Sequence, residues 1–325
     1  MSRVDLLRCS ASDDRARIGG MLAAWMCKAA DGLGEPNAVP LVLVTEHPSR
    51  QRVQAQWDAW REPLIAGLNG AGWIPTMAPS PREATSTAAE LPVGGRHFET
   101  FPVGAAVSGA AVLISLSRVT LHEKSGLEGV LHGLAIGSAA AEGLVKIQTG
   151  VQPHVERDMC GGCGMCVTYC GNEGIRHNGH VAVIRPENCL GCGDCLAECF
   201  MEALKFPVGG SRMLMERTAE AAAAVAASFR GRSLHGAVLM PEPARRSTMA
   251  GHHVPQPDLG ILVGTDPLAV ERAVADLVET DLGAPLAELC RCPEDPRHLL
   301  LHAGEVGLGN GDYELVDHAP GSLPG

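Results

Sequence analysis

The chain has 325 residues, a formal net charge of −11, and 12 cysteines against only 3% aromatic residues. Its length favours two or more domains with a sizeable core, while few rings and negative charge argue against nucleic-acid binding. No run of 18 apolar residues predicts a membrane helix, and residues 1–27 lack the apolar stretch of a signal peptide. We therefore expect a cytoplasmic protein, in which so many cysteines indicate metal or redox chemistry.

The first third of the chain alternates apolar and breaker-rich stretches. Residues 41–44 and 110–114 are short runs of aliphatic residues, which predict two buried strands. Helical spacing of Val53, Trp57, Trp60, Leu64 and Leu68 predicts a helix over 49–68. Residues 75–96 are rich in Pro, Ser, Thr and Gly, and we expect a loop there.

Two cysteine runs occupy the middle of the chain. The first run is Cys160, Cys163, Cys166 and Cys170, and the second is Cys189, Cys192, Cys195 and Cys199. Both have the spacing C-x2-C-x2-C-x3-C, and each cysteine of the first run recurs 29 positions later in the second. The runs are therefore an internal repeat.

This spacing predicts two [4Fe–4S] clusters. Three cysteines on a tight loop hold three irons of one cluster, and the fourth, on the following helix, ligates the other cluster. Cys160, Cys163, Cys166 and Cys199 then form the first site, and Cys189, Cys192, Cys195 and Cys170 the second. The alternative is a pair of zinc sites, although zinc prefers two C-x2-C knuckles that are further apart.

Between and after the runs, short strand patterns appear. Residues 175–184 alternate around Asn178-Gly179, which predicts a hairpin, and 203–206 occupy the place of a matching strand. The segment 156–206 thus resembles a bacterial dicluster ferredoxin. It departs from that pattern at Gly171 and Phe200, which replace the prolines that usually follow the fourth cysteines. The resemblance implies ligation by the eight cysteines and loops that are looser than usual.

The last third returns to alternating strands and helices. We expect a helix over 216–229, strands over 237–239 and 259–263, and a loop over 241–257. Asp266 and Pro267 are the N-cap and first residue of a helix that reaches about residue 278. The prediction is an α/β body with a mostly parallel sheet flanked by helices, in parts 1–155 and 207–325, with an inserted α+β ferredoxin-like domain at 156–206.

The segments 127–137, 257–271 and 307–316, together with Lys146, Pro153 and the cysteine runs, resemble the DUF362 family of iron–sulfur proteins. The likeness is good over 120–283 and implies a ferredoxin-like domain in an α/β body with a redox role. The family commonly has Lys-Asn at His132-Gly133, a histidine near Gly150, and a Cys-x-Cys where this chain has His252-His253. No family active site is therefore carried over.

Several further residues are candidates for chemistry. Cys9, Cys27, Cys290 and Cys292 either form a third metal site or are buried small residues, and Cys290-x-Cys292 alone could be a redox pair. His122, Lys124, His132 and Lys146 either line a substrate pocket or lie on a solvated face. His252-His253 are read as exposed loop residues.

Two functions fit these residues. The first is an electron carrier that passes single electrons through two clusters to a partner enzyme; the second is a reductase whose α/β body binds the substrate. The absence of nucleotide-binding motifs favours the carrier. Two loaded clusters would take the net charge from −11 to about −15. We therefore expect a redox partner with a basic docking surface.

Overall fold

The computed structural model describes residues 1–9, 19–22, 24–25, 40–45, 65–66, 69, 76–77, 87–239 and 258–318. Most of the predicted helix at 49–68 and the predicted loop at 241–257 lie outside these residues, as do Cys27 and His252-His253. The predictions for them therefore stay predictions.

A seven-stranded sheet forms the body, in the order β15-β1-β14-β13-β6-β2-β3. Its strands are β1 (Ser2–Leu7), β2 (Pro40–Thr45), β3 (Thr76–Met77), β6 (Val112–Arg118), β13 (Ser233–Leu239), β14 (Gly260–Gly264) and β15 (Tyr313–His318). β14 runs antiparallel to β1 and β13, while the remaining neighbours pair in parallel. The α/β class and the four predicted strands are confirmed, and the sheet is mixed.

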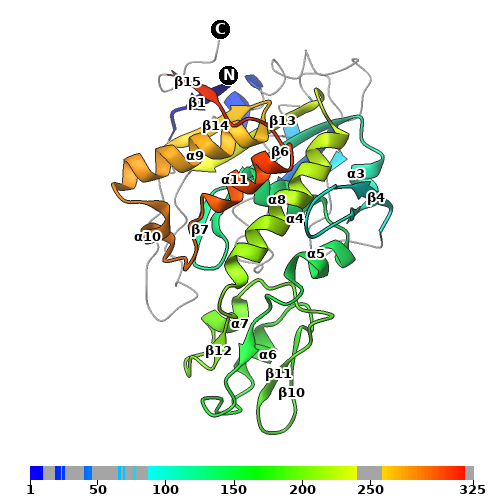
Figure 1. Cartoon of the computed structure of the whole chain (residues 1–325), viewed down its shortest axis with the longest axis vertical. Coiled ribbons are helices and arrows are strands. Elements are labelled where there is room, and N and C mark those ends of the chain that lie inside the picture. Colours follow the sequence, from blue (N-terminus) through cyan, green and yellow to red (C-terminus); the bar gives the residue numbers. More distant parts are fainter. Residues whose placement is uncertain are drawn as a thin grey trace.

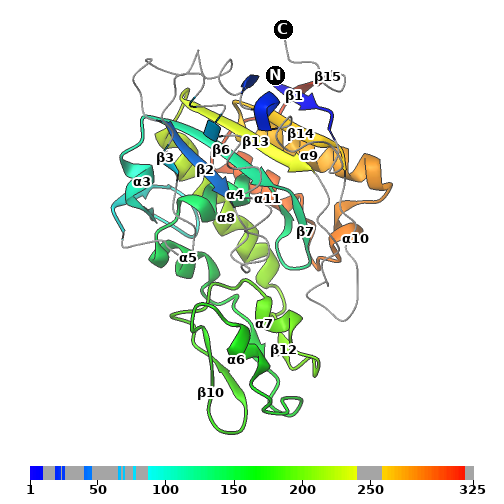
Figure 2. The ribbon, with the colours of Figure 1, turned by 180° about the vertical axis from the view of Figure 1, so that it is seen from behind.

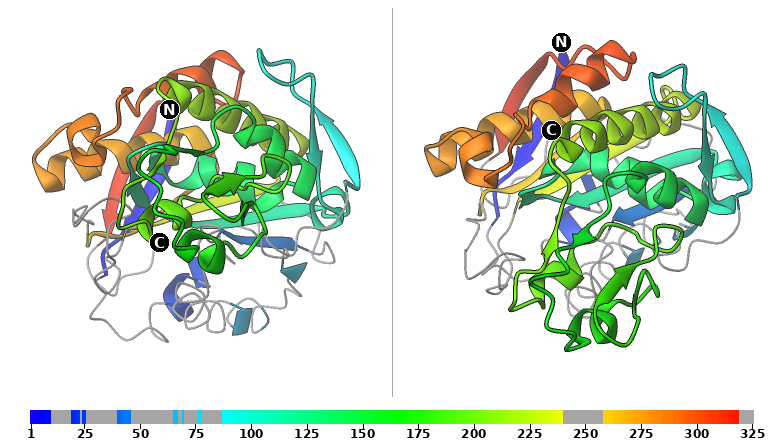
Figure 3. Two further views of the ribbon diagram at one scale, coloured as in Figure 1. Left: turned by 90° about the horizontal axis from the view of Figure 1, so that it is seen from below. Right: turned by 60° about the horizontal axis from the view of Figure 1, so that its bottom comes forward.

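Four described helices of the body, α4 (Val130–Ser138), α8 (Gly210–Ser228), α9 (Pro267–Leu282) and α11 (His298–Glu305), lie on one face of this sheet, as the three ribbon views agree (Figures 1, 2 and 3). α4 and α9 contact its strands, and α8 and α11 pack outside them. Shorter helices are α3 (Ala105–Ser108), α5 (Ala141–Gln148) and α10 (Leu286–Cys290). No helix in the described part of the chain is long and apolar enough to cross a membrane.

Local sequence explains where the two long helices begin and end. The Asp266 side chain accepts hydrogen bonds from the backbone N–H groups of Leu268 and Ala269, and Gly283 ends α9 with a φ of 69°. The predicted N-cap of α9 is thus confirmed. α8 begins at Gly210, before the predicted residue 216, and its run Ala221–Ala224 is buried against its neighbours. Alanine allows this close packing without large rings.

The predicted loop at 75–96 is wrong in two places, since Thr76–Met77 form β3 of the main sheet and residues 89–92 also form a strand. β4 (Ala89–Pro92) pairs with β5 (Thr100–Val103), and this hairpin lies beside α8. Pro92 has no backbone N–H to donate. It is tolerated because it is the last residue of a strand in a two-stranded sheet and not part of a central strand. The turn is held by Glu220, which accepts hydrogen bonds from the backbone of residues 96–98 and from His302.

Glu216 joins the same hairpin to α8 and α11. Its oxygens lie 2.6 Å from His97 Nε2, 2.9 Å from His298 Nε2 and 3.1 Å from Arg96 Nη1. Burial opposes ionisation of Glu216, but hydrogen bonds from His97, His298 and Arg212 outweigh it and lower its pKa to about 2. The ionised carboxylate therefore stabilises the folded state.

Glu216→Gln is expected to cost about 1.5–3 kcal/mol at pH 7, the usual range for hydrogen bonds to a charged group. Because the folded pKa is depressed, this stabilisation is present above the ordinary pKa of 4.5 and disappears as pH falls toward about 2. Urea unfolding at pH 7 and pH 3 measures it. Glu305→Gln is the control, since that carboxylate is 64% exposed. An equal cost of Glu216→Gln at both pH values would contradict the prediction.

A hairpin of β7 (Thr120–His122) and β8 (Gly126–Glu128) leads from the sheet into α4. Beyond α5 the chain forms the cysteine lobe, residues 154–206, which projects from the body (Figures 1 and 2). It contains β9 (His154–Val155), α6 (Met165–Tyr169), β10 (Ile175–His177), β11 (Ala182–Ile184), α7 (Asp194–Ala197) and β12 (Leu204–Lys205). The predicted hairpin at 175–184 is confirmed, and the predicted strand at 203–206 pairs with β9.

Candidate metal centre

The sequence repeat is also a structural repeat. In β9–β12, Val155 pairs with Leu204; in β10–β11, Ile184 pairs with Ile175. Val155 and Ile184 are 29 positions apart, and so are Ile175 and Leu204. Each two-stranded sheet therefore combines one strand from the first half of the repeat with one from the second. Backbone conformation repeats at the same interval, because Gly162 and Gly191, Gly164 and Gly193, and Glu173 and Glu202 all have positive φ. The two cysteine runs therefore occupy equivalent loops.

The fourth cysteine of each run accepts a backbone hydrogen bond. Gly174 N–H donates to Cys170 Sγ at 3.2 Å, and Ala203 N–H donates to Cys199 Sγ at 3.4 Å. Such N–H···S bonds stabilise a thiolate and influence the potential of a cluster that it binds. Sequence reasoning did not anticipate them, although the 29-residue repeat implies that one would be accompanied by the other.

One cavity joins cysteines from both runs. It is lined by the four thiol-bearing residues of the predicted first site, Cys160, Cys163, Cys166 and Cys199. About 380 Å³ inside it is unfilled by atoms, part of it open to solvent. Its other walls are glycine backbone and the apolar residues Val155, Met165, Ala182, Met201, Ala203 and Leu204. The structure thus brings Cys199 to the first run and not only to its own.

Electrostatic neighbours divide the thiols in the same way. Burial raises the pKa of Cys166, and the nearby thiols of Cys199, Cys160 and Cys163 raise it further. Burial likewise raises the pKa of Cys195, and its thiol neighbours are first Cys192, Cys189 and Cys170 and then Cys166 of the first site. Buried thiols that resist ionisation are poor nucleophiles but bind metal once a cation removes their protons.

The spacing of the thiols bears on the kind of metal. Within the described ranges, no three His, Cys, Asp or Glu side chains converge as ligands of a single ion would. The four thiols of a cubane cluster stand further apart, because each binds a different iron. Four thiols around an apolar cavity are compatible with such a cluster, whereas one zinc ion would need every sulfur at about 2.3 Å.

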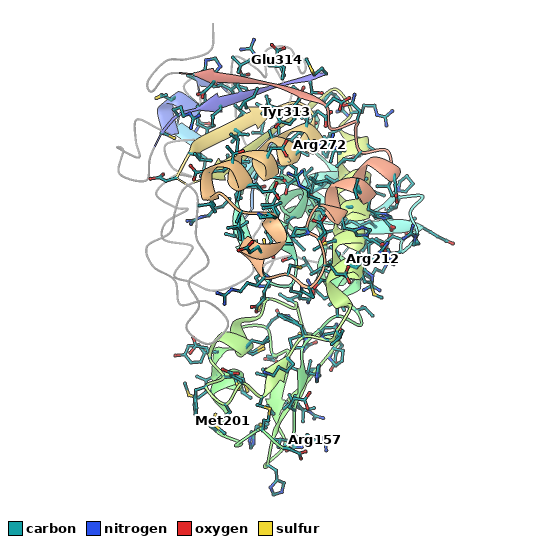
Figure 4. All side chains as sticks on the ribbon, turned by 60° about the vertical axis from the view of Figure 1, so that its left-hand side comes forward. Arg157, Met201, Arg212, Arg272, Tyr313 and Glu314 are labelled. Carbon is teal, nitrogen blue, oxygen red and sulfur yellow. The ribbon has the colours of Figure 1, made fainter. Side chains whose placement is uncertain are left out.

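The outer surface of the first site is apolar. Cys163 is exposed, and Met165 and Met201 line the same cavity. We define these two, with the exposed residues Met159 and Phe200 next to Cys160 and Met201 in sequence, as the methionine rim; Met159, Met165, Phe200 and Met201 are exposed by 42%, 36%, 72% and 44%. Met201 is on the side of the lobe away from the sheet, as is Arg157 (Figure 4). Exposed apolar patches of this kind are typical of interaction surfaces.

The second run faces the body instead. Cys189 and Cys195 are each 8% exposed. A second cavity lies between Leu190–Gly191 of this run and the β7–β8 hairpin, and its polar lining residues are His122, Lys124, Ser125, Glu128, His132 and Gln148. Three of the four predicted pocket residues thus come together here. Lys146 does not line the cavity; its side chain is 47% exposed and its Nζ lies 4.0 Å from Glu90.

Three of the other four cysteines, Cys9, Cys290 and Cys292, are among the described residues and lie elsewhere in the body. Cys290 and Cys292 are buried on and after α10, and Cys292 Sγ lies 3.7 Å from the carbonyl oxygen of Lys124. Burial raises the pKa of Cys290 to about 12, so its thiol stays protonated. Cys9 follows β1, and its backbone approaches Gly260. Cys290 and Cys292 fit the interpretation of buried small residues, and Cys292 contacts the turn of the β7–β8 hairpin.

The fold and the cysteine lobe together define an α/β protein that carries a repeated four-cysteine motif beside a mixed sheet. The chain belongs to the DUF362 family, whose model, described as a domain of unknown function, matches residues 33–276. Among curated proteins, no relative matches the chain.

Proposed function

We propose that the chain is an iron–sulfur electron-transfer protein that passes single low-potential electrons to a partner, with residues 156–206 as a dicluster ferredoxin-like domain inserted in the α/β body. The observation that carries the proposal is the cavity lined by Cys160, Cys163, Cys166 and Cys199. Its ligands come from both runs in the combination that two interlocked clusters require. When bound, each [4Fe–4S] cluster supplies one-electron oxidation and reduction.

The chain's own residues exclude water from the cluster sites and supply the negatively charged sulfur ligands. Apolar walls such as Val155 and Leu204 keep water from the inner thiols, and the N–H groups of Gly174 and Ala203 stabilise negative sulfur. The eight thiolates would be Cys160, Cys163, Cys166 and Cys199 at the first site and Cys189, Cys192, Cys195 and Cys170 at the second. Free thiols on this scale fit the reducing conditions of a cytoplasmic protein.

The methionine rim is the proposed contact surface for the redox partner. Near it in sequence are three exposed acidic residues, Glu156, Asp158 and Glu202, against the exposed Arg157 and against Lys205, which pairs with Glu202. Together with a net charge of −11, this surface favours a partner with basic residues around an apolar contact. An electron would cross near the exposed Cys163.

A second candidate function is favoured by the cavity between the second run and the β7–β8 hairpin. Imidazole, carboxylate and amine groups there could hold a small substrate and exchange protons with it, as a reductase needs. His132 Nδ1 lies 4.0 Å from Glu128 Oε1, so an imidazole and a carboxylate face the same cavity.

Anaerobic stopped-flow mixing with a basic c-type cytochrome tests the carrier. Substitution of Met165 and Met201 together by glutamine is expected to slow electron transfer at least tenfold, because apolar contact at the rim is lost. Leu301→Gln is the control, since this leucine is 61% exposed on α11 and outside the rim. Rates should also fall as salt is raised.

The same experiment includes a variant in the second cavity. His132→Gln should leave the rate to the cytochrome unchanged, because the proposed electron path to the rim does not use this cavity. A rim variant as fast as the parent, with full iron content, would contradict the proposed docking surface.

A further inference from the structure

The buried cation Lys124 stands out in the contact between body and lobe. It lies in the turn of the β7–β8 hairpin and is only 3% exposed. Its Nζ donates a hydrogen bond of 2.9 Å to Gln148 Oε1 and lies 4.3 Å from the centre of the Phe206 ring. Both of these partners are uncharged, and the carboxylate of Glu128, which lines the same cavity, also acts on the ammonium group.

These partners press against the second cysteine run. A Cβ atom on Gly191 would lie 2.1 Å from Gln148 Oε1, and one on Gly193 would lie 3.6 Å from the Phe206 ring. Lys124 therefore sits directly behind the loop that carries Cys189, Cys192 and Cys195. Burial lowers the pKa of Lys124 to about 8, while the sulfur of Cys189, the carboxylate of Glu128 and the sulfurs of Cys192 and Cys195 act in the opposite direction.

Reduction of a cluster adds one negative charge, so a nearby cation favours it. The effect is strong where protein replaces water and weak where solvent screens the charge. Lys124 is buried in protein, so its effect on a nearby cluster should be strong. Arg157, beside the first site, is exposed, so solvent screens its charge and its effect should be weak.

We propose that Lys124 raises the reduction potential of the second site, so that the cluster beside the body is the first of the two to be reduced. The inference rests on the proposed function, since it requires both clusters. Lys124 is a positioning charge in this scheme and takes no part in ligation.

Potentiometric titration of the full chain, followed by EPR, tests this inference. In Lys124→Gln, the equilibrium constant of one of the two reduction steps is expected to fall at least tenfold, which lowers its potential by about 59 mV for one electron. The potential of the other step should stay in place. Lys124→Arg should keep most of the parent value because the charge remains. Lys146→Gln is the matched control on the exposed surface and should move neither step.

A second variant guards against loss of folding. Gln148→Glu keeps the size of the side chain but places a carboxylate against Lys124, and it should lower the same step. With iron and sulfide content intact, unchanged steps in both variants, or equal shifts of both steps, would overturn the inference. If the parent chain takes up no iron and sulfide, the proposed function itself fails, so the two failures are distinguishable.

Discussion

Removal of Cys163 together with Cys199 is expected to leave about half of the iron in the protein, whereas removal of Cys192 together with Cys199 should leave almost none. The first pair belongs to one proposed cluster and the second pair to both. Serine is the substitution, because it preserves size but binds iron poorly. Anaerobic iron and sulfide analysis gives the result directly, with about eight, four or zero irons per chain.

The opposite grouping makes the opposite prediction. If each run held its own metal, loss of Cys192 and Cys199 would empty one site only, and loss of Cys163 and Cys199 would damage both. Cys170→Ser and Cys199→Ser are matched single variants, since both sulfurs accept an equivalent backbone hydrogen bond. Each should remove one cluster, and the EPR signal that remains should differ between them.

Gly260→Ala is expected to destabilise the body by about 2–6 kcal/mol, from backbone strain and overpacking together. Gly260 has a φ of 119°, and a Cβ there would lie 2.1 Å from the carbonyl oxygen of Leu7. That oxygen belongs to the neighbouring strand β1 and cannot move without breaking the pairing of β1 with β14. Domains of ordinary stability have only about 5–15 kcal/mol to lose.

Urea denaturation measures this loss, with Gly104→Ala as the control. Gly104 has a φ of −75° and nothing within 4 Å of an added Cβ, so its substitution should change stability little. A midpoint of Gly260→Ala equal to that of the parent would contradict the close approach of the two strands.

Much of the local structure could be predicted from sequence because its signals are local. Asp266 and Pro267 fix the start of α9, Asn178-Gly179 fixes a hairpin turn, and aliphatic runs fix strands. The direction of β14 could not be predicted, since it depends on how distant strands meet. β4 was missed because Pro92 and its neighbours are breakers whose strand is stabilised by long-range contacts with α8.

The candidate site divides in the same way. The 29-residue repeat can be recognised in the sequence, and it predicted which four cysteines form the first site. The same four cysteines line the cavity. The role of Lys124 depends on Gln148 and Phe206, which come from α5 and the end of the lobe, so no spacing rule could have joined them. Lys146 was grouped with Lys124 by proximity in sequence, but α5 turns it toward solvent.

The content of the two cysteine sites decides the central claim. Full-length protein prepared without oxygen should contain about eight irons and eight sulfides per chain and, after reduction, give the EPR signal of [4Fe–4S] clusters. Stoichiometric zinc without an EPR signal on reduction would contradict the account.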